Sequence, residues 1–218
     1  MITNTMNIEE ISEELFKDLR NVEGFVDKAL PKMRRAALRN RSKRYYQAFE
    51  FRTKQYNNWL VGIDYLKRDP SWVMFCYYLD RNRFNAVMVS IAPILLITHY
   101  FGHFLERYNE RFLSSKLKLK LDILKEYMLR NTIISFDFPY NDNRFLGYTT
   151  DGVILGYQES NSNWFNCKTF ITREMLFESQ NESIGRAALV FERFWDEVHN
   201  KTVIPEYYSP CTNVVKAS

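Results

Sequence analysis

Apolar residues near the start of the chain recur at helical spacing. Ile8, Ile11, Leu15 and Leu19 are three or four residues apart, and acidic residues lie between them. This spacing puts the apolar side chains on one face of a helix and the acids on the other. It predicts an amphipathic N-terminal helix, which Val22–Leu30 extends by another turn or two.

A second apolar stripe follows Pro31, a residue that suits the first position of a new helix. At roughly 100° per residue, five apolar side chains fall within about 40° of one another. The pattern predicts one long helix from Pro31 to about Leu66. The members of the stripe are Leu38, Tyr45, Phe49, Tyr56 and Leu60.

The pattern changes after Asp69-Pro70. Trp72–Leu79 and Phe84–Ile91 are rich in Val, Ile and aromatic residues, which favour strands, and the polar segment 80–83 between them suits a turn. These two segments therefore predict a β-hairpin. A further helix is expected at about Lys116–Arg130, where leucines recur at helical spacing.

The pattern of residues 145–171 predicts an antiparallel meander. Phe145–Thr150 and Val153–Gln158 flank Asp151-Gly152, a pair typical of a two-residue type I′ turn. Another turn leads into a third strand, Trp164–Ile171.

The order of these elements predicts an α+β fold in which N-terminal helices are followed by a small antiparallel sheet packed against helices. Thr172 can cap a closing helical region that runs to about Lys201. We expect three parts: an N-terminal helical extension over residues 1–70, an α+β domain over 71–204 and an irregular tail over 205–218.

Composition narrows the class of protein. Of the 218 residues, 46% are hydrophobic and 26% charged, which argues against disorder. The first residues lack a secretory signal, and the most apolar run, Phe84–Thr98, is shorter than a membrane span. Cys76, Cys167 and Cys211 are an odd number without metal-binding spacing. These features predict a soluble, cytoplasmic protein with no membrane contact and no disulfide framework.

Positive charge is concentrated in residues 32–54. Nine basic residues there face one acid, 9 − 1 = +8, although the whole chain carries only +4. Such a block is either a solvated or partner-facing helix, or a surface for a polyanion such as RNA. The candidate nucleic-acid contacts are Arg34, Arg35, Arg39, Arg41, Lys43 and Arg44.

The segment His99–Arg111 concentrates chemical groups on a predicted helix that Thr98 could cap. On a helical wheel His99, His103, Glu106 and Glu110 share one face. That face is either an ordinary charged surface or the start of a metal site, because histidines four apart can share a metal. The zinc-protease pattern needs a glutamate directly after the first histidine, and Tyr100 stands there, so no metal is expected.

A family resemblance offers a third interpretation. His103–Arg111 resembles the HxxxRxxER helix of small bacterial and phage proteins of the barnase–colicin–RelE-like ribonuclease superfamily. Asn166–Thr172 is similar to the KTF/Y-x-T strand of such proteins. The resemblance covers roughly His99 to Gln180 and implies cleavage of RNA, toxin-like or phage-type, without a metal or cofactor.

The resemblance also implies roles for individual residues. His103 would transfer protons, because the unperturbed pKa of histidine lies near neutrality. Arg107 and Arg111 would bind phosphate, and Glu110 would orient one of them. Strand alternation puts Lys168 and Thr169 on opposite faces, so at most one of them would be catalytic. Thr169 would share the core face with Phe165, Cys167 and Ile171, and Lys168 the other face with Asn166.

A second function fits the same sequence. The protein could be a non-catalytic scaffold of a phage or mobile element that binds RNA, a protein inhibitor or an assembly partner. The sequence leaves open which of His99 and His103 is functional, the RNA substrate and the oligomeric state.

Overall fold

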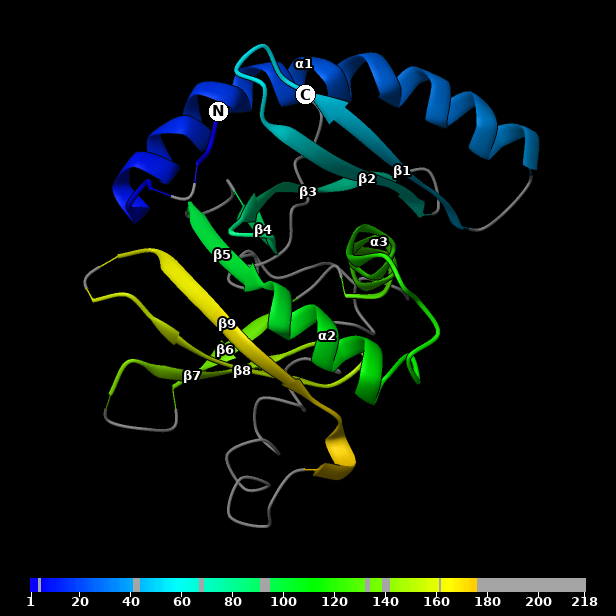
Figure 1. Ribbon diagram of the computed structural model, residues 1–218. Coiled ribbons are helices and arrows are strands. Elements are labelled where there is room, and N and C mark those ends of the chain that lie inside the picture. Colours follow the sequence, from blue (N-terminus) through cyan, green and yellow to red (C-terminus); the bar gives the residue numbers. More distant parts are fainter. Residues whose placement is uncertain are drawn as a thin grey trace.

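A nine-stranded sheet with helices on both faces forms the framework of the protein (Figure 1). The computed structural model describes residues 1–175, except residues 4, 41–43, 67–68, 91–94, 132–133, 139–141 and 161. The helices are α1 (Ile8–Asn40), α2 (Gly102–Arg111), α3 (Lys120–Arg130) and the short 3₁₀ helix η1 (Arg173–Met175). The strands are β1 (Arg44–Arg52), β2 (Asn58–Leu66), β3 (Asp69–Asp80), β4 (Arg83–Ser90), β5 (Leu96–Phe101), β6 (Ser135–Asp137), β7 (Arg144–Tyr148), β8 (Val153–Gln158) and β9 (Trp164–Ile171).

The sheet consists of two antiparallel blocks joined by one parallel pair. Its strand order is β1-β2-β3-β4-β5-β9-β8-β7-β6. Strands β1 to β5 are antiparallel neighbours, as are β6 to β9, whereas β5 and β9 run parallel. A parallel pair needs a long crossover. Here the chain passes through α2, α3 and the other strands of the second block before β9 reaches β5.

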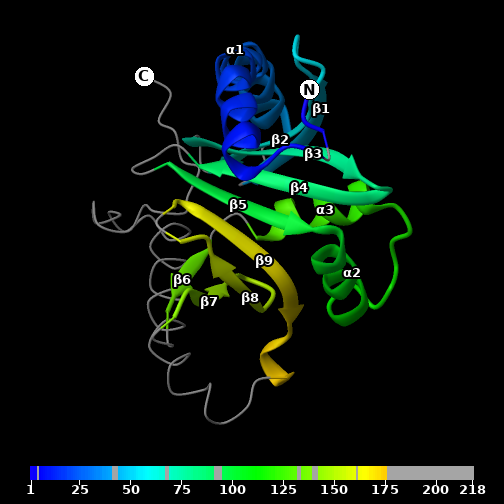
Figure 2. The same cartoon turned by 60° about the vertical axis from the view of Figure 1, so that its left-hand side comes forward.

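Helix α1 covers one face of the first block (Figure 2). Leu15, Val22, Val26 and Met33 recur at helical spacing, and all are buried against apolar side chains of β2 to β5. Pro31 lies inside this helix and does not begin a new one. The N-terminal helix predicted from the apolar spacing is therefore confirmed, and it continues to Asn40.

The predicted long helix from Pro31 to Leu66 is wrong beyond Asn40. The chain there forms β1 and β2, which pair with Phe49 opposite Val61. Tyr45, Phe49 and Phe51 pack under α1, whereas Tyr46 and Ala48 pack in the core on the opposite face. A strand with helices on both faces loses the polar alternation that would reveal it. Residues 1–70 are thus only partly helical.

The opposite face of the sheet carries α2 and α3. The sheet curves around α3, which packs on β2 and lies between the two blocks (Figure 1). Lys125 of α3 forms an ion pair with Glu50 of β1 (2.7 Å), and Arg130 binds Asp151 in the loop before β8 (2.8 Å). Tyr127, fully buried, contacts the rings of Tyr100, Phe104 and Tyr108. This aromatic core attaches α2 and α3 firmly to the sheet.

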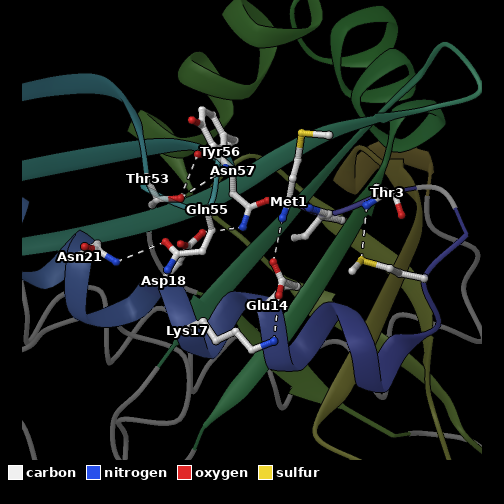
Figure 3. A network of polar contacts seen from close by, with 12 residues as sticks. Met1, Thr3, Glu14, Lys17, Asp18, Asn21, Thr53, Gln55, Tyr56 and Asn57 are labelled. Carbon is white, nitrogen blue, oxygen red and sulfur yellow. Dashed lines mark hydrogen bonds and ion pairs between the residues drawn. The ribbon is translucent and has the colours of Figure 1, made fainter.

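A buried polar contact aligns α1 with the β1–β2 turn (Figure 3). One carboxylate oxygen of the fully buried Asp18 accepts hydrogen bonds from Asn57 Nδ2 (2.7 Å) and Trp59 Nε1 (2.9 Å). The Asn57 amide oxygen accepts the backbone N–H of Ile2, and the amino group of Met1 pairs with Glu14. These contacts fasten the first residues of the chain against the start of β2.

Two hairpins follow the predicted pattern, with one difference in detail. In the β3–β4 hairpin the turn residues Arg81 and Asn82 have positive φ angles, as a type I′ turn requires. Asp151-Gly152 does not form the predicted two-residue turn, because Tyr148 already pairs with Val153 and closes a four-residue loop. No described glycine has a positive φ.

The predicted fold class is confirmed as α+β, but the sheet is larger than expected and is mixed, not purely antiparallel. The meander β7-β8-β9 is confirmed and gains β6 as a further strand. The helix predicted at 116–130 begins at Lys120, and of the one after Thr172 only η1 falls within the described residues. No described helix has the length and apolar character to cross a bilayer. Cys76 and Cys167 are free and buried.

Candidate functional site

The predicted helix His99–Arg111 is in fact a strand followed directly by a helix. Thr98 and His99 belong to β5, and α2 begins at Gly102. A Cβ atom at Gly102 would lie 2.5 Å from the carbonyl oxygen of Phe84, so only glycine permits this close passage. Thr98 therefore caps no helix, and the proposed stripe of His99, His103 and two glutamates does not exist.

The polar face of α2 is exposed, and its side chains pair with each other. Arg107 Nη1 lies 2.8 Å from a carboxylate oxygen of Glu110, and Arg107 Nε lies 3.4 Å from His103 Nε2. His103 Nδ1 is 3.5 Å from Glu106, which also binds Lys120 at 2.6 Å. Glu110, which the resemblance gives the role of orienting an arginine, thus forms an exposed ion pair with Arg107. Among the described residues, no group of acids, histidines and cysteines could hold a metal ion.

Arg111 has a structural contact. Its guanidinium Nη1 donates a hydrogen bond to the backbone oxygen of Phe170 in β9. The two segments that carry the family resemblance, α2 and β9, therefore lie side by side (Figure 1). Arg111 and Arg107 are both partly exposed but differ in their partners, because Arg111 bonds to the strand and Arg107 pairs with Glu110 of its own helix.

Lys168 and Thr169 do not alternate as a regular strand would. Leu155 pairs with Thr169 and Gly156 with Cys167, so the pairing skips Lys168. Phe165 and Cys167 lie in the core as predicted. After Cys167 the core residue is Phe170, and not Thr169 or Ile171, because the irregular pairing shifts the alternation of faces. Lys168 is exposed, and its ammonium group lies over the rings of Phe101 (4.2 Å) and Tyr157 (5.0 Å).

The basic block is divided between two elements. Arg34, Arg35 and Arg39 are exposed on the last turns of α1. Arg44 lies in β1, where it binds Asp64 (2.7 Å) and the backbone oxygen of Leu129 (3.1 Å). Arg41 and Lys43 lie outside the described residues. The predicted continuous basic helix is therefore wrong, although three of its arginines share an exposed helix end.

A pocket of about 640 Å³ opens on the α1 face of the sheet, where the two blocks meet. Its wall combines the first residues of the chain and of α1 with the ends of β3, β5 and β8 and the start of β9. We call it the His99 pocket. The sheet side of its wall consists of Tyr78, Asp80, His99, Phe101, Tyr157, Glu159, Trp164 and Asn166.

His99 lies at the floor of this pocket, 8% exposed. Its imidazole packs against the rings of Tyr78, Phe101 and Trp164, and its Nε2 lies 3.4 Å from the Tyr78 hydroxyl. Burial lowers the pKa of His99 to about 4; the Asn166 side chain opposes this shift and the charge of Lys168 adds to it. The imidazole is therefore neutral at physiological pH and offers one donor and one acceptor.

Asn166 is the neighbour of His99 across the parallel pair and is held on two sides. Its amide oxygen accepts a hydrogen bond from Trp164 Nε1 (3.1 Å), and its Nδ2 donates to Glu159 (3.0 Å). Because both ends of the amide are engaged, its orientation is fixed. Burial raises the pKa of Tyr78, so that hydroxyl keeps its proton.

Sequence reasoning missed most of this pocket. Of the lining residues it singled out His99 as a functional candidate, but placed it on a helix. Tyr78, Asp80 and Glu159 come from strand ends far apart in the sequence, and only the strand order brings them together. The available signal was weak: His99 and Asn166 are polar residues inside largely apolar strands, but Thr98, Lys168 and Thr169 share that property. No protein-family model, curated protein or solved structure matches this chain.

Proposed function

We propose that the protein binds a small molecule in the His99 pocket. One observation carries the proposal: His99, Asn166, Glu159 and Tyr78 converge from three regions of the sheet on one pocket of small-molecule size. Pockets of about 300–1,000 Å³ with aromatic walls and a few placed polar groups are typical of ligand sites. The volume and the lining of this pocket fit that description.

The polar groups of the pocket are organised in advance. His99 and Asn166 stand on neighbouring strands, and hydrogen bonds fix the Asn166 amide. Groups held in place lose little conformational entropy when a ligand binds, so more of the interaction energy contributes to affinity. This rigidity favours a binding role for the site.

Trp164 provides a direct test of binding. Trp164 lines the pocket and its indole N–H donates to Asn166, another lining residue, whereas Trp59 does not line the pocket and its N–H donates to the buried Asp18. A panel of small aromatic compounds is added to ¹⁵N-labelled protein, with the Trp164 signal assigned through a Trp164→Phe variant. We expect at least one compound to shift the Trp164 signal in a saturable manner and to leave that of Trp59 in place.

Variants show whether the pocket is responsible. Tyr157→Ala removes part of the aromatic wall and should weaken the saturable shift. Leu79→Ala is the matched control, because Leu79 lies between Tyr78 and Asp80 but is 66% exposed. If no compound shifts the Trp164 signal, or if both variants bind equally well, the proposal is wrong.

A second candidate function is the metal-independent ribonuclease that the family resemblance implies. The observation that favours it is the packing of α2 against β9, which joins the two resembling segments through Arg111 and Phe170. His103 would then transfer the proton and Arg107, paired with Glu110, would bind the phosphate. The exposed Arg34, Arg35 and Arg39 would supply RNA contacts.

This candidate predicts RNA cleavage that persists in a chelator and is lost in His103→Ala and Arg107→Ala. Lys118→Ala is the matched control, because it also removes one exposed positive charge but lies in the loop after α2. RNA binding should weaken as salt rises, because phosphate contacts release counterions. Cleavage that survives in His103→Ala would exclude the proposed role of this helix. If neither the original protein nor any variant cleaves RNA, the ribonuclease function is excluded and the small-molecule binding function remains.

A further inference from the structure

The charged side chains that line the His99 pocket all have the same sign. Three carboxylates line it, those of Glu9, Asp80 and Glu159, and none of the described lining residues is Lys or Arg. Since His99 is neutral, the lining carries a formal charge of −3. A phosphate or carboxylate entering the pocket would face repulsion from these groups, whereas a cation would be attracted.

The aromatic wall already holds a cation. The ammonium group of Lys168 lies 4.2 Å from the ring centre of Phe101 and 5.0 Å from that of Tyr157, and both rings also border the pocket. Lys168 itself is exposed and does not line the pocket. The faces of aromatic rings attract ammonium groups, and several rings together form the sites that bind alkylammonium ligands. The wall is thus suited to a second ammonium group on its inner side.

One carboxylate oxygen in the lining lacks a partner. Oδ1 of Asp80 is buried and has no hydrogen-bond partner among the described residues. A buried acceptor without a donor is unfavourable, so a ligand N–H bonded to this oxygen would stabilise the complex. Together with the lining charge and the rings, this oxygen points to a ligand with a charged donor.

We propose that the His99 pocket selects an organic cation, a protonated amine attached to an apolar or aromatic body. The proposal rests on the proposed binding function and adds the ligand class. The apolar body packs among Tyr78, Phe101 and Trp164, and the ammonium group binds Asp80. Glu159 and Glu9 add attraction from the rim, and the neutral His99 places no positive charge against the ligand.

Three probes with the same ring and different charge test the ligand class: phenethylammonium, 2-phenylethanol and phenylacetate. Titration is followed through the Trp164 indole signal of the full-length chain. We expect the ammonium compound to bind roughly tenfold more tightly than the alcohol, on the scale of a desolvated cation–π contact with an ion pair, and phenylacetate to bind more weakly than the alcohol.

Substitutions separate charge from general affinity. Asp80→Asn should bring the ammonium affinity close to that of the alcohol and leave the affinity for the alcohol unchanged. Asp122→Asn, an exposed carboxylate on α3, is the control and should change neither. Lys168→Met should strengthen binding of the ammonium compound, because it removes a cation from the same rings. A circular-dichroism melt of each variant confirms that it is folded.

The outcomes distinguish the two levels of the proposal. If the alcohol or phenylacetate binds as well as the ammonium compound, or if Asp80→Asn leaves the preference intact, cation selection is wrong and the pocket remains a binding site. If none of the three probes binds but another compound of the aromatic panel does, cation selection is likewise overturned. If nothing shifts the Trp164 signal, the binding function itself fails.

Discussion

His99 and Asn166 lie opposite each other on the parallel strands β5 and β9. One belongs to the first antiparallel block of the sheet and the other to the second, so the contact between the blocks also forms the floor of the pocket. The polar face of α2, which carries most of the charge in that part of the sequence, lines no part of this pocket.

The buried state of His99 predicts a pH dependence of stability. Its pKa is about 4 in the folded protein and near 6.5 when unfolded, because burial disfavours the charged form. Between about pH 4 and pH 6.5, this histidine therefore binds a proton in the unfolded chain but not in the folded protein. This contribution to stability is complete above about pH 6.5 and declines as pH falls towards 4, by about 3 kcal/mol in total.

Urea unfolding between pH 4 and pH 7 measures this contribution. His99→Gln should flatten the slope in that window, whereas His103→Gln should retain it because His103 is exposed. An unchanged slope in His99→Gln would show that His99 does not titrate as described.

Gly102→Ala should destabilise the protein strongly. The new Cβ would lie 2.5 Å from the backbone oxygen of Phe84, so β4 or the start of α2 must move. Overpacking of this kind costs about 1–3 kcal/mol. Gly24→Ala in α1 is the control, because no atom lies within 4 Å of its Cβ position, and it should be neutral or stabilising by up to about 1 kcal/mol. Thermal unfolding compares the two, and equal melting temperatures would contradict the close passage.

Asp151 should be essential for stability. Its buried carboxylate accepts hydrogen bonds from Arg130 (2.8 Å), Tyr108 (2.7 Å) and Asn131 (2.9 Å), and so connects α2, α3 and the loop before β8. We expect Asp151→Asn to cost about 2–3 kcal/mol, since it removes the charge that these donors surround.

Asp142→Asn provides the comparison for Asp151. Asp142 also pairs with an arginine, Arg144, but 47% of its side chain is exposed. Little change in the free energy of unfolding is expected there, because water screens an exposed ion pair. Chemical denaturation should separate the two variants clearly; similar losses would mean that the buried contacts of Asp151 add nothing.

Substitutions on the outer face of α2 should have little effect on stability. The ion pair of Arg107 with Glu110 is exposed, and such pairs contribute about 0–1 kcal/mol. Arg107→Ala and His103→Ala should therefore unfold at nearly the same urea concentration as the original protein. A large loss of stability would contradict this prediction and reveal contacts beyond those on the helix surface. A loss of activity in such a variant could then reflect unfolding and not the role of the side chain.

The sequence predicts those parts of the fold that have one polar face or a clear turn. The spacing of Ile11, Leu15 and Leu19 identifies α1, because acids mark its outer face. The hairpin of β3 and β4 is predictable because Arg81 and Asn82 separate two apolar runs. Local chemistry determines both structures.

The parts that sequence reasoning misses depend on distant contacts. In β1, Tyr45 and Tyr46 are partly buried on opposite faces, so no polar alternation marks the strand. Tyr45 and Phe49 are four residues apart, a spacing that also fits a helical stripe. His99 and His103 have helical spacing, but β5 is fixed by pairing with β4 and β9. Only Gly102, where β4 passes close by, indicates the change from strand to helix. The candidate site is equally hard to predict from the sequence, because only the strand order brings its residues together.

The parallel pairing of β5 with β9 has a consequence for folding kinetics. Ile97 pairs with Trp164 across a long separation in the sequence, whereas the hairpin strands pair residues that are close in the sequence. Contacts between distant residues form more slowly because a long loop must close first. We therefore expect this contact to form late and to open early under mild denaturant. Amide hydrogens of β5 and β9 should then exchange faster than those of β2 and β3. The His99 pocket should lose its structure before either block of the sheet unfolds.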